Sequence, residues 1–340
     1  KKTNPMLLID FAGQKIFDNA TVDVNIIMFS KQKSNGKTTA CLAEAGCLNN
    51  LSDFVRQESI TMNFCNNNNW IILSPIEQEI NRKINTYGTP LKEWNIKINF
   101  GIKTGFNDAF IIDSKIKDRL ILQDPKSAEL IRPILRGRDI KRYHYDFMDL
   151  WLINTHNGVK NMGIPPVLVD DYPAIKNHLD NYYDKLKKRA DQGITPYNLR
   201  NCIYMDEFSK QKIVWARLSR ISKKDFSDFP RFSLVPEDYV TLDSLCFLTG
   251  RHLDILIHLL NSKFAAYYFF NNVAILDNGG MQMRQQFVEN IPLPQSLINI
   301  DYSSVTSIDK TIFDAFGFND TEIKFISDYL ENKKAEISKK

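Results

Sequence analysis

The stretch GIKTGFNDAFIID (101–113), followed by LIRPILRGRDIKRY (130–143), decides how this sequence is interpreted. Its first half is a glycine-containing loop that leads into an apolar strand predicted over 109–112. In its second half, five basic residues stand within eleven positions: Arg132, Arg136, Arg138, Lys141 and Arg142. Gly137 lies inside this cluster, beside the single acid Asp139, and favours a turn over a helix face. Such a basic turn is typical of a phosphate-backbone contact, with a solvated surface loop as the alternative.

Length and composition are those of an ordinary folded protein. The 340 residues are 43% hydrophobic and 25% charged, which suits two or three domains with a substantial core. The formal net charge of +4 is weak, so any contact with nucleic acid has to come from local patches. Five cysteines without CxxC pairing indicate a reducing cytoplasm. We expect no membrane span, because polar residues interrupt the most apolar region, 253–276.

The first third of the chain predicts part of a sheet and one helix. Apolar runs at 6–11 and 22–29 suit strands of a sheet that is covered on both faces. Two strands cannot make such a sheet, so we expect the rest of it to precede this chain, whose first residue is not methionine. The polar segment 31–37 is expected to be a domain boundary. Residues 74–88 predict a helix with a capping box that starts at Ser74.

The rest of the chain predicts strands interspersed with helices. The expected strands are 149–154, 213–218 and 239–250, and the expected helices are 172–193, 251–270 and two short ones within 301–340. A basic run, Lys185 to Arg189, lies in the helix at 172–193. We expect a solvated face there, with a phosphate contact as the alternative.

Further candidate DNA contacts lie in two other segments. Arg217 and Arg220 lie at the end of the strand predicted over 213–218, where an arginine fork suits a guanine edge or a phosphate, and a salt bridge at the sheet end is the alternative. The Gly-Gly loop at 277–294 carries glutamine and arginine, which match adenine and guanine edges, with a flexible turn as the alternative. The candidate DNA-binding residues are therefore Lys103, Thr104, Asn107, Arg136, Arg138, Lys141, Arg142, Arg217, Arg220, Gln282, Arg284 and Gln285.

No catalytic motif is found in the sequence. The phosphate-cradling patterns GxxxxGK[ST] and GxGxxG and the nucleophile elbow GxSxG are all missing. The five histidines do not have the spacing of metal ligands. We therefore expect neither catalytic residues nor a metal site in this chain.

These motifs resemble a known family. GIKTGFNDAFIID and AELIRPILRGRDIKRY are similar to the opening of the TaqI-like C-terminal specificity domain, which occurs in adenine-specific DNA methyltransferases and type IIG restriction–modification enzymes. The resemblance continues through FSKQKIVWARLSR and LIHLLNSKFAAYYFF to GGMQMRQQFVENIPLP. Upstream, residues 8–31 are similar to the last strands of the methyltransferase domain that precedes this specificity domain.

The resemblance implies an α/β (α+β) protein in four parts. The last strands of a Rossmann-like methyltransferase sheet would occupy 1–35, and a connector with a capped helix 36–100. A mixed α+β target-recognition domain would follow at 101–295, with a short helical tail at 296–340.

It also implies a prokaryotic, cytoplasmic DNA-binding protein. The target-recognition domain would read double-stranded DNA and hold it for base flipping and adenine-N6 methylation by catalytic parts outside this chain. The S-adenosylmethionine motif and the Asn-Pro-Pro-aromatic motif are missing here. S-adenosylmethionine, and Mg²⁺ for any nuclease part, are therefore expected in the N-terminal part of the same protein and not in this chain.

Two questions stay open in the sequence. One is whether the parent enzyme cleaves DNA or only methylates it. The other is an alternative function, a protein-interaction or partner-docking module of a related phage-defence methyltransferase system. That function would require a large exposed apolar patch instead of a basic cleft.

Overall fold

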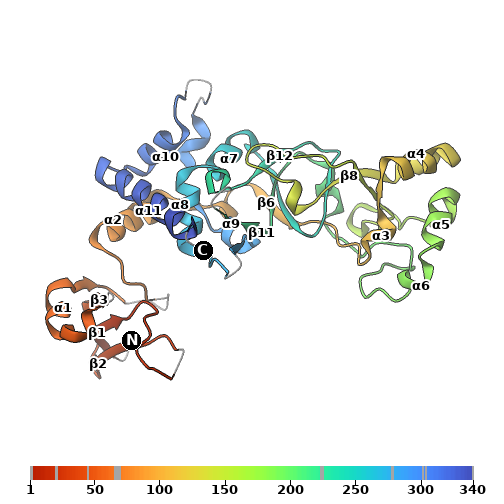
Figure 1. Cartoon of the computed structure of the whole chain (residues 1–340). Coiled ribbons are helices and arrows are strands. Elements are labelled where there is room, and N and C mark those ends of the chain that lie inside the picture. The colour runs from red at the N-terminus through yellow and green to blue at the C-terminus, as the bar shows by residue number, and fades with distance from the viewer. Residues whose placement is uncertain are drawn as a thin grey trace. The chain divides into compact units, whose positions relative to one another are not determined.

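The computed structural model describes residues 3–19, 22–43, 46–64, 70–222, 226–276, 279–300, 302 and 305–338. The chain divides into two compact units, Lys1–Lys83 (unit 1) and Ile84–Lys340 (unit 2) (Figure 1). Each unit combines helices with small sheets, so the mixed α+β class expected from the sequence is confirmed. Among the described residues, no helix is both long and apolar enough to cross a membrane.

Unit 1 is built on a four-stranded sheet in the order β2-β1-β3-β4. The strands are β1 (Asn4–Asp10), β2 (Asn25–Ser30), β3 (Thr38–Leu42) and β4 (Ile60–Met62), and the helix α1 (Leu51–Glu58) precedes β4. β1 pairs antiparallel with β2 and parallel with β3. Alternate residues of β1 face opposite sides of the sheet, so Leu8 packs in one core cluster and Ile9 in another.

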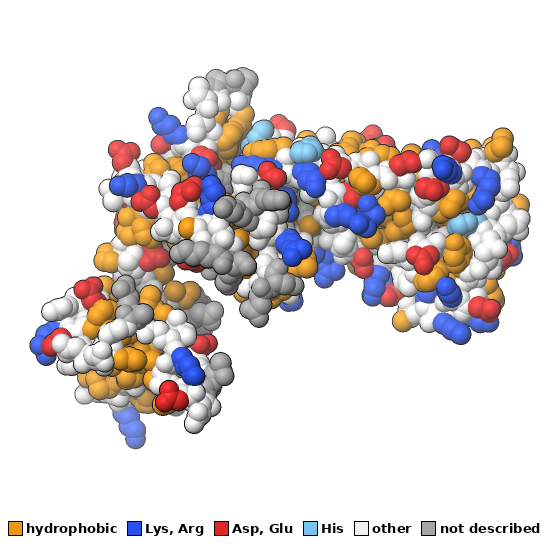
Figure 2. Space-filling view, in the orientation of Figure 1, with side chains coloured by type: hydrophobic (Ala, Val, Ile, Leu, Met, Phe, Trp, Pro, Cys, Tyr) orange, Lys and Arg blue, Asp and Glu red, His pale blue; other side chains and the backbone are white. Residues whose placement is uncertain are grey.

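The strand β2 differs from its sequence-based prediction. It forms an edge of the sheet, and Ile26, Ile27, Met28 and Phe29 are 41–58% exposed. Figure 2 shows hydrophobic side chains gathered on the visible face of unit 1. The expectation of two strands buried on both faces therefore holds for β1 and is wrong for β2.

Unit 2 contains two four-stranded sheets and two short ribbons. The first sheet has the order β12-β10-β14-β6, and the second has the order β13-β8-β9-β7. Their strands are β6 (Ile96–Phe100), β7 (Ile111–Asp113), β8 (Ile131–Leu135), β9 (Leu150–Ile153), β10 (Lys212–Ala216), β12 (Ser233–Val235), β13 (Val240–Thr241) and β14 (Leu245–Gly250). The ribbons pair β11 (Leu218–Arg220) with β15 (Gly280–Gln282), and β5 (Thr89–Pro90) with β16 (Pro292–Leu293). One hydrophobic core joins residues of both sheets.

The other regular elements of unit 2 are helices. They are α3 (Asn107–Phe110), α4 (Ser114–Gln123), α5 (Pro173–Asp180), α6 (Tyr183–Leu186), α7 (Leu253–Leu260), α8 (Lys263–Asn272), α9 (Gln285–Glu289), α10 (Ile308–Phe316) and α11 (Asp320–Ser338), and α2 (Pro75–Tyr87) spans the division between the units. In Figure 1 the helices α7, α8, α10 and α11 lie together, and Phe264 of α8 contacts Phe316 of α10 with ring centroids 4.5 Å apart.

Two predicted long helices are each broken in the structure. The helix expected at 251–270 is α7 followed by α8, because Asn261 turns out of the helix to exchange side-chain hydrogen bonds of 3.0 Å with the backbone of Phe232. Ser262 then caps α8 by accepting from the amide of Ala265 at 3.1 Å. In place of the single helix expected at 172–193, the structure has two short helices, α5 and α6. The strand expected at 109–112 begins only at Ile111, after the short helix α3.

The unit boundaries also differ from those expected. The segment 36–62 supplies β3 and β4 to the sheet of unit 1, so the polar break at 31–37 is a loop within that sheet. β6 pairs with β14 and places 96–100 in unit 2, although this segment was expected in a connector. The C-terminal helices pack on α7 and α8, so 296–340 is a part of unit 2. The reason is the same in each case: pairing partners distant in sequence decide which unit a segment joins.

Candidate nucleic-acid interface

The basic turn that opens the site is held by one buried carboxylate. After β8 ends at Leu135, the side chain of Asp139, which is 2% exposed, accepts hydrogen bonds from Arg136. The donors are the backbone N at 2.8 Å, Nε at 3.1 Å and Nη2 at 3.0 Å. The amide of Gly137 donates to Oγ of Ser244 at 3.0 Å and fixes the turn to the strand loop before β14. The ion pair of Asp139 is therefore formed with Arg136.

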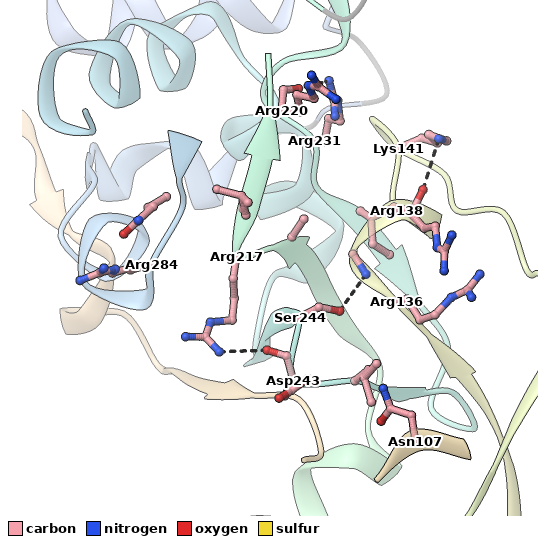
Figure 3. A pocket seen from close by; sticks show the side chains of 16 residues that line it. Asn107, Arg136, Arg138, Lys141, Arg217, Arg220, Arg231, Asp243, Ser244 and Arg284 are labelled. Atoms are coloured by element: carbon pink, nitrogen blue, oxygen red, sulfur yellow. Dashed lines mark hydrogen bonds between the residues drawn. The ribbon is translucent and has the colours of Figure 1, made fainter. Parts of the chain in front are cut away.

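Segments that lie far apart in the sequence meet at this turn and line a cavity of about 850 Å³, the basic pocket (Figure 3). They are the turn itself, the chain from β10 through β11, the loop 242–244 before β14, and the chain from β15 into α9, together with Asn107 and Arg231. Its charged lining is Arg136, Arg138, Lys141, Arg217, Arg220, Arg231, Arg284 and Asp243. Seven cations against one carboxylate make the pocket more positive than the whole chain, whose formal net charge is +4.

The cations of the basic pocket differ in how far their side chains are committed to other groups. Arg138, Arg220 and Arg284 make no side-chain hydrogen bond or ion pair within the described part of the chain. Arg217 donates from Nη1 to the carbonyl of Asp243 at 3.0 Å, and Lys141 lies 3.8 Å from a carboxylate oxygen of Asp146. Three guanidinium groups are thus available in full to an anion that enters the pocket.

Eight of the twelve candidate residues line the basic pocket. They are Asn107, Arg136, Arg138, Lys141, Arg217, Arg220, Gln282 and Arg284. The pocket also contains Arg231, which the sequence analysis missed; its Nη2 donates to the carbonyl of Arg220 at 2.9 Å. Arg231 follows Phe229-Pro230 in a segment with no other basic neighbour, so only the folded chain shows its place. Residues 277 and 278 of the expected Gly-Gly loop lie outside the described residues.

The other four candidates lie outside the pocket lining. Arg142 donates to the carbonyls of Asn261, Ser227 and Phe229 at 2.6, 3.3 and 3.4 Å. Lys103 pairs with Asp191 at 2.6 Å, and Thr104 is buried. Gln285 starts α9 and donates to Glu289 at 3.1 Å. Arg142 in particular joins three backbone segments of the fold.

A buried arginine, Arg189, holds the loop at 101–107 in place. Gly101 admits no side chain, because a Cβ there would overlap the carbonyl of Leu242. The Arg189 bridge consists of Arg189 donating to the carbonyls of Thr104, Pro196 and Asn198. Its guanidinium lies 4.6 Å from the ring centroid of Phe110, and burial lowers its pKa to about 10. Arg189, the last residue of the basic run at 185–189, is therefore not available for the phosphate contact considered for that run.

The chemistry of the basic pocket is that of anion binding. Unpaired guanidinium groups bind phosphate through paired N–H donors, and asparagine and glutamine amides match the edges of bases. Among the described residues, no three His, Cys, Asp or Glu side chains are grouped closely enough to hold a metal ion. Cys41, Cys47, Cys202 and Cys246 are free thiols, and Cys65 lies outside the described residues.

Comparison with known proteins agrees with this architecture. Residues 132–293 match the family described as the TaqI-like C-terminal specificity domain. No curated protein sequence matches the chain. The chain is similar in structure to the type IIL restriction–modification enzyme MmeI, solved in complex with DNA, with a TM-score of 0.52 and 12% identity over 99% of this chain and 46% of that one. The match to the type IIG restriction endonuclease BpuSI has a TM-score of 0.49 and 14% identity over 98% and 44%. The chain thus spans less than half the length of either enzyme.

Proposed function

We propose that unit 2 is the DNA target-recognition part of a restriction–modification enzyme that methylates adenine N6. The observation that carries the proposal is the basic pocket, in which seven cations converge within a TaqI-like specificity domain. Phosphate contacts supply most of the affinity of such proteins for DNA and set the register of the duplex. Amide side chains beside them, such as Asn107 and Gln282, are suited to reading base edges.

Within this proposal the cations have separate roles. Arg138, Arg220 and Arg284 contact phosphates, because their guanidinium groups have no partner in the described protein. Arg136 shapes the turn through Asp139 and adds charge without offering a free fork. The duplex held in this way is presented for base flipping, which brings the target adenine out of the stack.

The chemical step belongs to another part of the same protein in this proposal. S-adenosylmethionine binding and methyl transfer, and Mg²⁺-dependent cleavage if the enzyme also cuts, are placed in a methyltransferase part and a nuclease part outside this chain. The support is the missing catalytic sequence motifs and the length of the similar enzyme MmeI, of which this chain covers 46%. The chain would then contribute affinity and specificity to the reaction.

Salt-dependent binding to duplex DNA tests this function. We expect the 340-residue chain to bind a random-sequence duplex at low salt, with an affinity that falls linearly on a logarithmic salt scale. Replacing Arg138, Arg220 and Arg284 together by glutamine should reduce the slope by about 2.7, since each phosphate contact contributes about 0.9. Arg119→Gln, which changes an exposed arginine of α4 outside the pocket, is the matched control. Fluorescence anisotropy measures both; an absence of binding at low salt, or an unchanged slope in the triple variant, refutes the function.

Unit 1 supports a second, complementary role. The edge strand β2 presents four consecutive apolar side chains together with unpaired backbone groups, and such an edge accepts a further strand. The occupant that we propose is a strand of the methyltransferase part of the same protein, which would make β2 an inner strand. A separate partner subunit on the same edge is the alternative, and it corresponds to a docking module.

Hydrogen exchange distinguishes these two occupants. In the isolated chain, the backbone amides of 25–30 that point away from β1 should exchange rapidly, because no strand covers them. In the full-length enzyme without other proteins, the same amides should be protected. Equal, rapid exchange in both samples would leave the edge open within the enzyme and would favour a separate partner subunit.

A further inference from the structure

The ribbon β11–β15 presents two chemically different faces. Ser219 and Met281 are paired across it and both are buried, so this face packs on the protein. The opposite face carries Leu218 paired with Gln282, and Arg220 paired with Gly280. Leu218 is 54% exposed, and Leu218, Arg220 and Gln282 all line the basic pocket. The outward face is therefore an apolar side chain and an amide directly opposite each other, with a free arginine beside them.

Hydrogen bonds hold both ends of the ribbon in place. Trp215, which is 1% exposed, donates from Nε1 to the carbonyl of Met283 at 2.9 Å, one residue beyond Gln282. The amide of Ile221 donates to the carbonyl of Gly279 at 2.9 Å at the other end of the ribbon. Fixed backbone on both sides of the Leu218–Gln282 pair limits the positions that its side chains can take. Such preorganisation is what discrimination between similar ligands requires.

The pair suits a base pair better than it suits the phosphate backbone. Leu218 has no hydrogen-bonding group, and the neutral amide of Gln282 makes no side-chain hydrogen bond within the described part of the chain. An amide that offers a donor and an acceptor side by side matches N6 and N7 of adenine in the major groove. An exposed aliphatic side chain matches the C5-methyl group of thymine. Adenine and thymine present these two features at the two sides of one base pair.

We infer that the ribbon β11–β15 enters the major groove and that Leu218 and Gln282 together read one A·T base pair, Gln282 on the adenine and Leu218 on the thymine methyl. The major groove admits a two-stranded β-ribbon, and cross-strand neighbours lie about 5 Å apart, close enough to reach both bases of one pair. Arg220, beside Arg231, and Arg284, at the start of α9, line separate parts of the pocket, where they contact the phosphates that flank the groove (Figure 3). This inference rests on the proposed function and adds the base pair that the pocket specifies.

Selection from a random-sequence duplex library, followed by sequencing of the bound fraction, tests this assignment on the full chain at low salt. The wild type should enrich a motif that contains an A·T position. In Gln282→Arg the preference at that single position should change from adenine to guanine, since arginine pairs with O6 and N7 of guanine. The wrong base should be disfavoured by roughly 5- to 150-fold at that position. Leu218→Ala should weaken the preference at the same position only.

Arg138→Gln is the control variant, because it should weaken all sequences alike and leave the motif unchanged. A wild-type motif that stays unchanged in Gln282→Arg overturns the base-pair assignment and leaves DNA binding by the pocket intact. A change spread over several positions also overturns it. If the wild type enriches no duplex while the low-salt anisotropy shows no binding, the proposed function itself fails.

Discussion

The basic pocket and the Arg189 bridge use the same kind of side chain for opposite purposes. In the pocket, the side chains of Arg138, Arg220 and Arg284 have no hydrogen-bond or ion-pair partner among the described residues, and all three line the cavity. In the bridge, Arg189 is 6% exposed and donates from Nη1 and Nη2 to three carbonyls of the chain itself. Both arginines 138 and 189 stand in basic runs of the sequence, so local charge density does not distinguish them.

The two regions differ in whether the protein provides hydrogen-bond acceptors for the guanidinium groups. A buried guanidinium is stable only where carbonyls or carboxylates satisfy its N–H groups, and loops that turn their carbonyls inward provide them. Arg142 and Lys212 follow the same pattern as Arg189, since their donors also end on backbone carbonyls. We call Arg142, Arg189 and Lys212 the internal set. We therefore expect substitutions in the internal set to change stability, and substitutions in the pocket to change binding of DNA.

The largest effect is expected for Arg189→Met. This change keeps the apolar contact with Phe110 and leaves the carbonyls of Thr104 and Pro196 without the donors they have in the wild type, while the carbonyl of Asn198 keeps the amide of Gly193 at 3.1 Å. Each buried acceptor left unpaired costs about 1–3 kcal/mol, so the free energy of unfolding should fall by roughly 2 kcal/mol or more. Urea unfolding followed by tryptophan fluorescence measures it, with the exposed neighbour Lys188→Met as the control. Equal stability of the two variants would contradict a structural role for the Arg189 bridge.

A smaller, pH-dependent effect is expected at Lys212. This lysine of β10 is fully buried and donates to the carbonyls of Pro236 and Tyr239 at 3.0 Å. Burial lowers its pKa from 10.5 to about 8, while Asp238 and Glu237 partly oppose the shift. Between pH 8 and 10.5 the unfolded chain then binds more protons than the folded one, so this lysine makes stability rise with pH by up to about 1.4 kcal/mol per pH unit. The difference in unfolding free energy between wild type and Lys212→Met should show this slope; a difference independent of pH would contradict it.

Features fixed by neighbours three or four residues apart were predictable from the sequence. The capping box of α2 forms as expected, with the amide of Ser74 donating to Glu77 at 2.8 Å. A similar local pair forms at the start of α11, where the amide of Asn319 donates to Glu322 at 2.7 Å. The basic turn at 136–141 was found in the same way, because its charges lie within one short segment.

Features fixed by distant partners were not predictable. The acceptors of Arg142 belong to residues 85 to 119 positions further along the chain, so its internal role is invisible in a local window. The break between α7 and α8 depends on Asn261 bonding to Phe232 of another segment. Arg231 reaches the pocket only because its segment runs beside β11. Each case requires knowledge of tertiary pairing, which periodicity and capping signals do not contain.

The smallest effects are expected for two single variants, Arg142→Gln in the internal set and Arg138→Gln in the pocket. Arg142→Gln removes a charged donor from the carbonyl of Asn261, and such hydrogen bonds contribute about 1.5–3 kcal/mol to stability. Its salt slope for duplex binding should stay that of the wild type. Arg138→Gln should show the reverse, with stability within about 0.5 kcal/mol of the wild type and a salt slope lower by about 0.9. A loss of salt slope in Arg142→Gln with unchanged stability would move Arg142 from the internal set into the DNA-contacting set.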